Sequence, residues 1–163
     1  MINNKSKKLK IFKIILFILT GAYIVFIWAH STMDAKTSSG ESLYVLEFVT
    51  NFLKSIGIST ELTDHIIRKS AHFSEFALLG CLSLWCGYLL NKNIVKCLMP
   101  AGFVSLFVAV IDEYIQLFSV GRSCEVKDVL LDFTGSVCGA AFFVVIVIII
   151  MLIKKRKKRK NSK

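Results

Sequence analysis

Four acidic side chains stand out because they lie within or beside apolar segments of the sequence. Asp112 and Glu113 come near the end of one such segment, and Asp128 and Asp132 come at the start of the next. A charged side chain at the centre of a bilayer costs about 2.5–3.5 kcal/mol, so Asp112 and Glu113 together would cost roughly 5–7 kcal/mol if they faced lipid. We therefore expect these carboxylates to face other parts of the protein, where they could bind a ligand or join helices.

The spacing around Asp112 predicts a helix with one polar and one apolar side. At about 100° per residue, Asp112, Glu113 and Gln116 fall within one arc. The polar arc is expected to face the interior of a helix bundle, and the other side to face lipid. That apolar side carries Phe107, Val110, Ile111, Tyr114 and Phe118.

The next helix repeats this pattern and adds a packing surface. Asp128 and Asp132 share an arc with Gly135 and Gly139. Glycines four residues apart let two helix backbones approach closely in a membrane. The sequence therefore predicts that these acids lie on the face where two helices pack.

A third helix, upstream of the other two, presents Lys69, His72 and Glu75 on one face. At 1.5 Å per residue, Glu75 lies about 10 Å inside the outer end of its helix, and Glu113 and Asp132 lie about 7.5 Å inside theirs. Three helices thus place polar groups at one depth, in the outer half of the membrane. The predicted binding site consists of Lys69, His72, Glu75, Asp112, Glu113, Gln116, Arg122, Asp128 and Asp132.

The balance of charge leaves the chemistry of this site open. Five acids lie near three strong bases, Arg68, Lys69 and Arg122, and this excess predicts protonated carboxyls, a bound cation or a ligand with positive character. One hypothesis is a non-enzymatic pocket in which Lys69 and Arg122 bind phosphate and the acids accept amine or hydroxyl groups. The structural alternative is that polar side chains only join helices, at about 0.6–2 kcal/mol each.

An enzymatic hypothesis uses the same residues. His72 could act as a general base oriented by Glu75 or Asp132. A divalent cation could instead lie among Glu75, Glu113 and Asp128. No nucleophile motif or metalloprotease spacing occurs in the sequence, so we assign no catalytic residue, metal or cofactor and favour a non-enzymatic role. A proton-coupled transporter is disfavoured, because the acids stop in the outer half of the spans.

The 163-residue chain has the composition of a one-domain membrane protein. Its residues are 55% hydrophobic, which is high for a soluble protein. The sequence therefore predicts an all-α fold with a four-helix membrane domain at 11–153. Segments of about 20 apolar residues, enough to cross a hydrocarbon core about 30 Å thick, are Ile11–Ala29, His72–Leu90, Leu98–Phe118 and Phe133–Ile153.

The distribution of basic residues predicts the orientation. Of the 21 lysines and arginines, fifteen lie at the two termini and between the second and third segments, which predicts that both termini are cytoplasmic. The basic stretches are a disordered N-terminus at 1–10 and a tail at 154–163. Anionic lipid headgroups explain the tail better than nucleic acid does. The first segment is expected to be a retained membrane anchor and not a cleaved signal peptide. Cys124 is the one cysteine expected on the outer side of the membrane.

The first outer connection, His30–Asp64, predicts one further helix. Ser31–Gly40 is rich in small and polar residues and is expected to be a loop. From Ser42 to Ile56, apolar residues recur on one side at helical spacing. We expect an amphipathic helix that lies on the outer surface and ends at Gly57.

A series of short motifs runs through the second half of the chain. In order they are Glu113 and Gln116 (ExxQ), Gly121-Arg122-Ser123, Asp128 and Asp132 (DxxxD), and Gly135 with Gly139, all downstream of RKSAHFSEFALLG at 68–80. This ordered set, over about half of the chain, resembles the VanZ-like family of small bacterial membrane proteins. Val120 and Ile115 stand where many relatives have proline and some have histidine, which loosens the loop and removes one proton carrier.

The resemblance implies a multi-pass protein of the bacterial cell membrane and a role in the cell envelope. The founding member is associated with resistance to the glycopeptide teicoplanin, so the expected effect is a lower susceptibility to such antibiotics. The expected partners are membrane lipids and a lipid-linked cell-wall precursor or the glycopeptide itself.

Overall fold

The computed structural model describes residues 2–33, 35–56 and 63–161 of the chain. In these ranges the chain forms helices and no strand, and four of the helices contain stretches long and apolar enough to cross a membrane. The predicted fold class, all-α with four candidate membrane spans, is confirmed. The helices are α1 (Ile2–Ser31), α2 (Ala35–Ser55), α3 (Asp64–Leu90), α4 (Ile94–Gln116) and α5 (Val126–Lys160).

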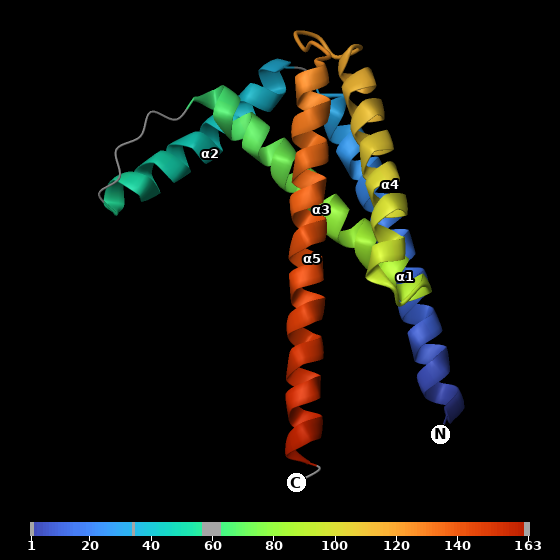
Figure 1. The fold of residues 1–163 in the computed structure, drawn as a ribbon. Helices are drawn as coiled ribbons and strands as arrows, with labels where there is room; N and C mark the ends of the chain where they lie inside the picture. Colours follow the sequence, from blue (N-terminus) through green and yellow to red (C-terminus); the bar gives the residue numbers. More distant parts are fainter. Residues whose placement is uncertain (1, 34, 57–62, 162–163) are drawn as a thin grey trace.

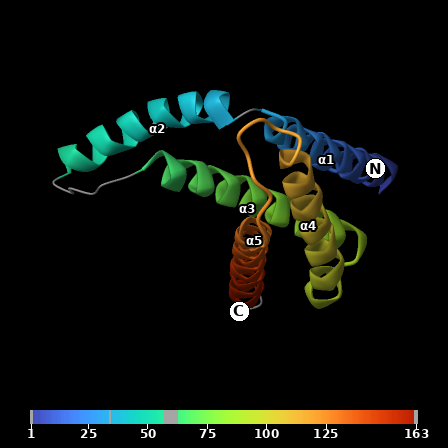
Figure 2. The ribbon, with the colours of Figure 1, turned by 90° about the horizontal axis from the view of Figure 1, so that it is seen from above.

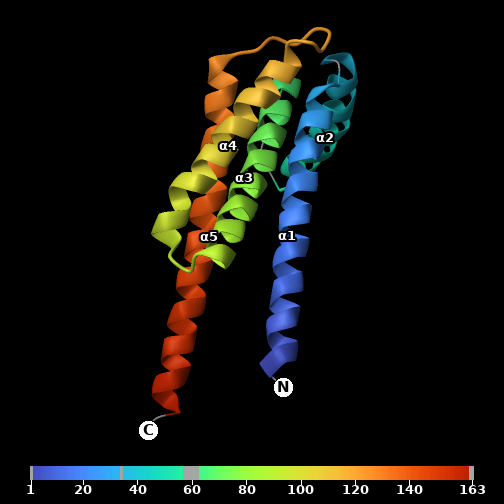
Figure 3. The same cartoon turned by 90° about the vertical axis from the view of Figure 1, so that its right-hand side faces the viewer.

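Helix α3 connects the other helices into one bundle. It runs obliquely and contacts each of the other four (Figure 1). Seen from above, α1 lies on one side of α3 and α5 on the other (Figure 2). Both chain ends lie at the same end of the bundle (Figure 3), as an even number of spans requires. That this end is cytoplasmic stays a prediction from the distribution of lysine and arginine.

Glycines allow α3 and α5 to approach closely. A Cβ atom added at Gly139 would overlap the carbonyl oxygen of Ala77, and one added at Gly135 would lie 2.5 Å from that of Phe73. Gly80 contributes the same kind of contact from α3, because a Cβ there would overlap the backbone of α5. The polar residues at the start of α5 are therefore held directly against α3.

An apolar cluster between α1, α3 and α4 lies next to the polar end of the bundle. Two hydrogen bonds from α1 reinforce it: the Tyr23 hydroxyl donates to the Glu75 carbonyl at 3.1 Å, and Trp28 Nε1 donates to the Val108 carbonyl at 3.3 Å. These contacts fix the depth of α1 relative to its neighbours. The fully buried members of the cluster are Ile27, Phe76, Leu79, Val108 and Ala109.

The structure differs from the expectation for the first outer connection. Ser31–Gly40 is not a loop, since α1 continues to Ser31 and α2 begins at Ala35. Ser31 is buried against α4 and donates a hydrogen bond to Asp112, and these contacts keep it within α1. The expected helix at Ser42–Ile56 is present but begins earlier. Its expected end at Gly57 lies outside the described residues.

Two helices also extend into the basic stretches near the two ends of the chain. Residues 2–10, expected to be disordered, form the first turns of α1, and α5 continues through the basic tail to Lys160. Lysine and arginine are good helix formers, and neither stretch contains the proline or glycine that would break a helix. The expectation of disorder at residues 2–10 is therefore wrong.

Candidate functional site

The end of the bundle opposite the chain termini is closed by residues 117–125, which join α4 to α5 (Figure 1). The loop starts with a tight turn in which the backbone N–H of Arg122 donates to the Ser119 carbonyl at 3.2 Å. Gly121 within the turn has φ 78°, a left-handed conformation that side chains disfavour. The turn brings Arg122 to the edge of a polar cavity between α3 and the start of α5.

The polar face of α4 lies inside the bundle. Asp112 is 0% exposed and Glu113 is 2% exposed. Gln116 Nε2 donates to Asp112 Oδ2 at 3.1 Å and to Glu113 Oε1 at 3.0 Å. The other carboxylate oxygen of Glu113 accepts the backbone N–H of Glu125 at 3.1 Å. One glutamine thus ties the two acids together, and Glu113 links α4 to the N-terminal end of α5.

Helix α1 supplies two residues that the sequence did not single out. Ser31 Oγ donates to Asp112 Oδ1 at 2.5 Å, and the Ser119 hydroxyl donates to the Ser31 carbonyl at 2.9 Å. His30 Nδ1 lies 3.2 Å from Glu75 Oε1. The available signal was the position of His30 and Ser31, a polar pair at the C-terminal end of a largely apolar segment.

One ion pair crosses from α3 to α5. Lys69 Nζ lies 2.5 Å from Asp128 Oδ1, with both side chains partly exposed. A pair that solvent reaches contributes at most about 1 kcal/mol. Its main effect is therefore to orient the two side chains at the mouth of the cavity.

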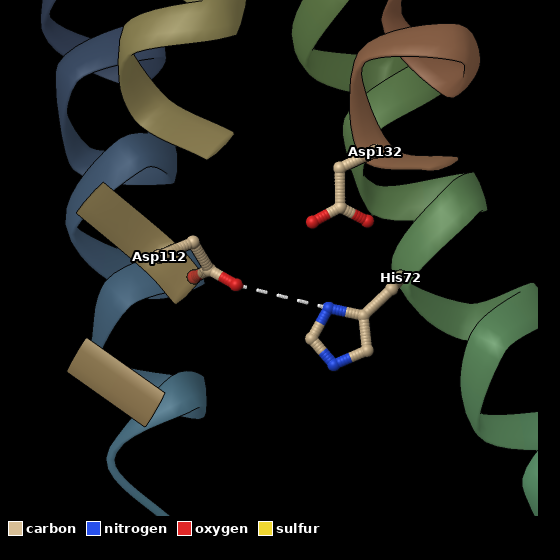
Figure 4. Close-up of side chains that lie close together, drawn as sticks. All are labelled: His72, Asp112 and Asp132. Carbon is tan, nitrogen blue, oxygen red and sulfur yellow. Dashed lines mark ion pairs between the residues drawn. The ribbon is translucent and has the colours of Figure 1, made fainter. Parts of the chain in front are cut away.

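A group of three side chains meets deeper in the bundle. His72 from α3, Asp112 from α4 and Asp132 from α5 bring ligand atoms within 4.8 Å of one another (Figure 4). His72 Nδ1 lies 3.9 Å from Asp112 Oδ2. Asp112 is therefore the acid that can form an ion pair with His72.

This arrangement corrects two parts of the enzymatic hypothesis. Glu75 does not orient His72, because Glu75 pairs with His30. Glu75, Glu113 and Asp128 do not form the group that could share a cation; within the described part of the chain, that group is the one around His72. The reason is that helical periodicity fixes which face a residue occupies but not the angle at which two helices cross.

The cavity has a volume of about 340 Å³ and a strongly polar lining. Its walls come from α3, α5 and the loop, with Glu113 and Gln116 of α4. Arg68 and Lys127 add positive charge to the lining. Two predicted site residues, Glu75 and Asp112, do not line it but bond to α1 beside it. The predicted residues that line it are Lys69, His72, Glu113, Gln116, Arg122, Asp128 and Asp132.

Comparison of the sequence with protein-family models finds one family that matches most of the chain. The VanZ/LLP1 family model matches residues 12–152, a range that includes the cavity and at least part of every candidate span. No curated protein and no solved structure matches the chain.

Proposed function

Because the chain belongs to the VanZ/LLP1 family, we propose that it acts in the bacterial cell membrane, where its polar cavity binds the anionic headgroup of an envelope amphiphile. The observation that carries the proposal is the convergence of arginine, lysine and acids from α3, α4, α5 and the α4–α5 loop on one cavity of about 340 Å³. Small-ligand sites span about 300–1,000 Å³. The volume suits a headgroup and is too small for a whole glycopeptide.

Positive groups in the cavity suit phosphate. Arg122 offers a planar set of donors that matches phosphate oxygens, and Lys69 and Arg68 add positive charge. The cavity also lies at the N-terminal end of α5, where the helix dipole favours an anion. A phosphate or pyrophosphate headgroup would therefore meet hydrogen-bond donors from α3 on one side and from the loop and the start of α5 on the other.

The acids of the cavity suit a different part of the same ligand. Asp128 and Glu113 line the same space as Arg122, and carboxylates accept hydrogen bonds from amines and hydroxyls. A lipid-linked cell-wall precursor carries both phosphate and hydroxyl or amine groups. A protein that bound such a precursor at the outer face would alter its access to glycopeptides and would thereby lower susceptibility to them.

The test is a titration of lipid-linked wall precursor into the protein in nanodiscs. We expect saturable binding by the wild type and at least tenfold weaker binding by Arg122→Ala, because a charge-assisted hydrogen bond contributes about 1.5–3 kcal/mol. Arg156→Ala, in the basic tail far along α5, is the matched control and should bind like the wild type. Equal affinities of Arg122→Ala and the wild type would refute the assignment.

A hydrolase or transferase acting on the same lipid is a second candidate, favoured by the pairing of His72 with the buried Asp112. At 3.9 Å the two groups are not hydrogen-bonded, but a bond that tightened when substrate bound would orient the imidazole as a general base. In this case the purified wild type would change the mass of the precursor on incubation, and His72→Ala would not. A precursor that leaves the wild type chemically unchanged excludes this candidate and leaves the binding role.

A further inference from the structure

We propose that His72, Asp112 and Asp132 form a binding site for a divalent ion of the first transition series. The three side chains come from α3, α4 and α5, and their ligand atoms lie within 4.8 Å of one another (Figure 4). The proposed metal site follows from the geometry and burial of these three side chains. It does not require that the cavity bind a lipid headgroup.

The distance between His72 and Asp112 fits two ligands of one ion better than a direct bond. Their nearest atoms are 3.9 Å apart, whereas an N–H···O hydrogen bond spans about 2.7–3.2 Å. Four-coordinate zinc holds imidazole nitrogen and carboxylate oxygen at about 2.0–2.2 Å in a tetrahedron, so two of its ligand atoms lie roughly 3.3–3.6 Å apart. The ligand atoms of the three residues lie within 4.8 Å of one another, so a contraction of about 1 Å would bring them into this range.

Asp132 supplies an independent sign of a ligand. The residue is 1% exposed, and its Oδ2 atom is buried without a hydrogen-bond partner among the described residues. In Figure 4 its carboxylate points into the space between His72 and Asp112. Buried charged groups are normally paired or bound to a metal, and a cation in this space would satisfy the oxygen.

Neighbouring groups hold Asp112 in a fixed orientation. Ser31 donates to one of its oxygens and Gln116 to the other. Such outer hydrogen bonds orient ligands around bound metals and strengthen binding. Asp112 therefore presents an oxygen to the site without having to rearrange.

The types of the three ligand atoms narrow the choice of ion, and the cavity gives an ion a route to them. One imidazole and two carboxylates suit zinc, manganese or iron, while thiolate ligands would favour softer metals. His72 and Asp132 also line the polar cavity, which gives an ion a route from solvent. The chain carries five cysteines, so Mn²⁺, which prefers nitrogen and oxygen donors, is the cleaner probe.

The test is a titration of the full-length protein in detergent with Mn²⁺ alone, with the free ion followed by electron paramagnetic resonance. We expect one saturable site per chain in the wild type and at least tenfold weaker binding in Asp132→Asn and His72→Gln. Glu47→Gln, on α2 and outside the trio, should bind like the wild type. Circular dichroism checks that each variant remains helical.

Two outcomes would overturn the site: a wild type with no saturable binding, or Asp132→Asn and His72→Gln with wild-type affinity. A wild type with no saturable binding overturns the site whether or not the variants fold, and either variant locates the site by itself if the other fails to fold. Because no lipid is added, a negative result here leaves the proposed headgroup binding untouched. Loss of headgroup binding in Arg122→Ala likewise would not bear on Mn²⁺ affinity.

Discussion

At the scale of single residues, Asp112 is a buried acid that is hydrogen-bonded on both carboxylate oxygens. It is 0% exposed and accepts hydrogen bonds from Ser31 and Gln116. The sequence predicted that Asp112 faces inward, because a charge facing lipid is costly. Its bond to Ser31 was not predictable in the same way. A serine at the end of a span costs little at the membrane interface, so its type alone gives no sign of a buried contact.

Replacing Ser31 tests this contact. Ser31→Ala should lower the free energy of unfolding by about 1–3 kcal/mol, because it removes a hydrogen bond to a buried carboxylate. The measurement is unfolding in mixed micelles with increasing SDS, followed by circular dichroism. Thr32→Ala is the neighbouring control, since the Thr32 hydroxyl donates to the Ala29 carbonyl at an exposed position. Equal free energies of unfolding for the two variants would show that the Ser31–Asp112 hydrogen bond stabilises the protein no more than an exposed one does.

At the scale of elements, the contact between α3 and α5 determines where the polar groups meet. Gly135 and Gly139 allow the two backbones to approach, so Asp132 on α5 comes within reach of His72 on α3. The sequence pattern indicated both glycines, since small residues four apart signal close packing. It did not indicate which acid meets which histidine, because that depends on the angle at which α3 crosses its neighbours.

A methyl group at the contact should separate the helices. Gly139→Ala would place a Cβ on the Ala77 carbonyl oxygen, and overpacking of this kind typically costs about 1–3 kcal/mol. Gly21→Ala is the matched control, because nothing lies within 4 Å of a Cβ added at Gly21. Thermal unfolding in detergent should show a lower midpoint for Gly139→Ala alone. An unchanged midpoint would mean that α3 and α5 do not pack through this glycine.

The loop between α4 and α5 depends on one glycine. Gly121→Ala forces a side chain into a left-handed conformation, which costs about 1–2 kcal/mol. Because Arg122 follows directly, we also expect weaker binding of lipid-linked precursor. Gly121→Asn should be milder, since asparagine tolerates this conformation. Binding by Gly121→Ala at wild-type strength would show that the turn does not position Arg122.

At the scale of the whole molecule, the α4–α5 loop lies at the end of the bundle opposite both chain ends (Figures 1 and 3). Residues of this loop line the polar cavity, so the cavity lies at that end too. The charge pattern predicts that the chain ends are cytoplasmic, which would place the cavity at the outer face. An even number of spans places both chain ends on the same side of the membrane, but it does not determine which side that is. The basic residues therefore carry the prediction of sidedness, and the packing of the helices does not.

Cys124 tests the orientation with a natural side chain. It is exposed in the loop beside the cavity, so a membrane-impermeant maleimide should label it on intact cells. Cys138 is also exposed but lies within α5, where lipid excludes a charged reagent. Cys124→Ser should abolish the labelling. A wild type that reacts only after the cells are permeabilised would place the cavity on the cytoplasmic side.

Native mass spectrometry of the protein released from its own membranes tests headgroup binding most directly. We predict that the wild type and Arg156→Ala retain a phosphate-bearing lipid as an adduct, and that Arg122→Ala loses it. A wild type that is released bare under conditions that preserve other lipid adducts would contradict the account. An adduct that survives in Arg122→Ala as fully as in the wild type would contradict it as well.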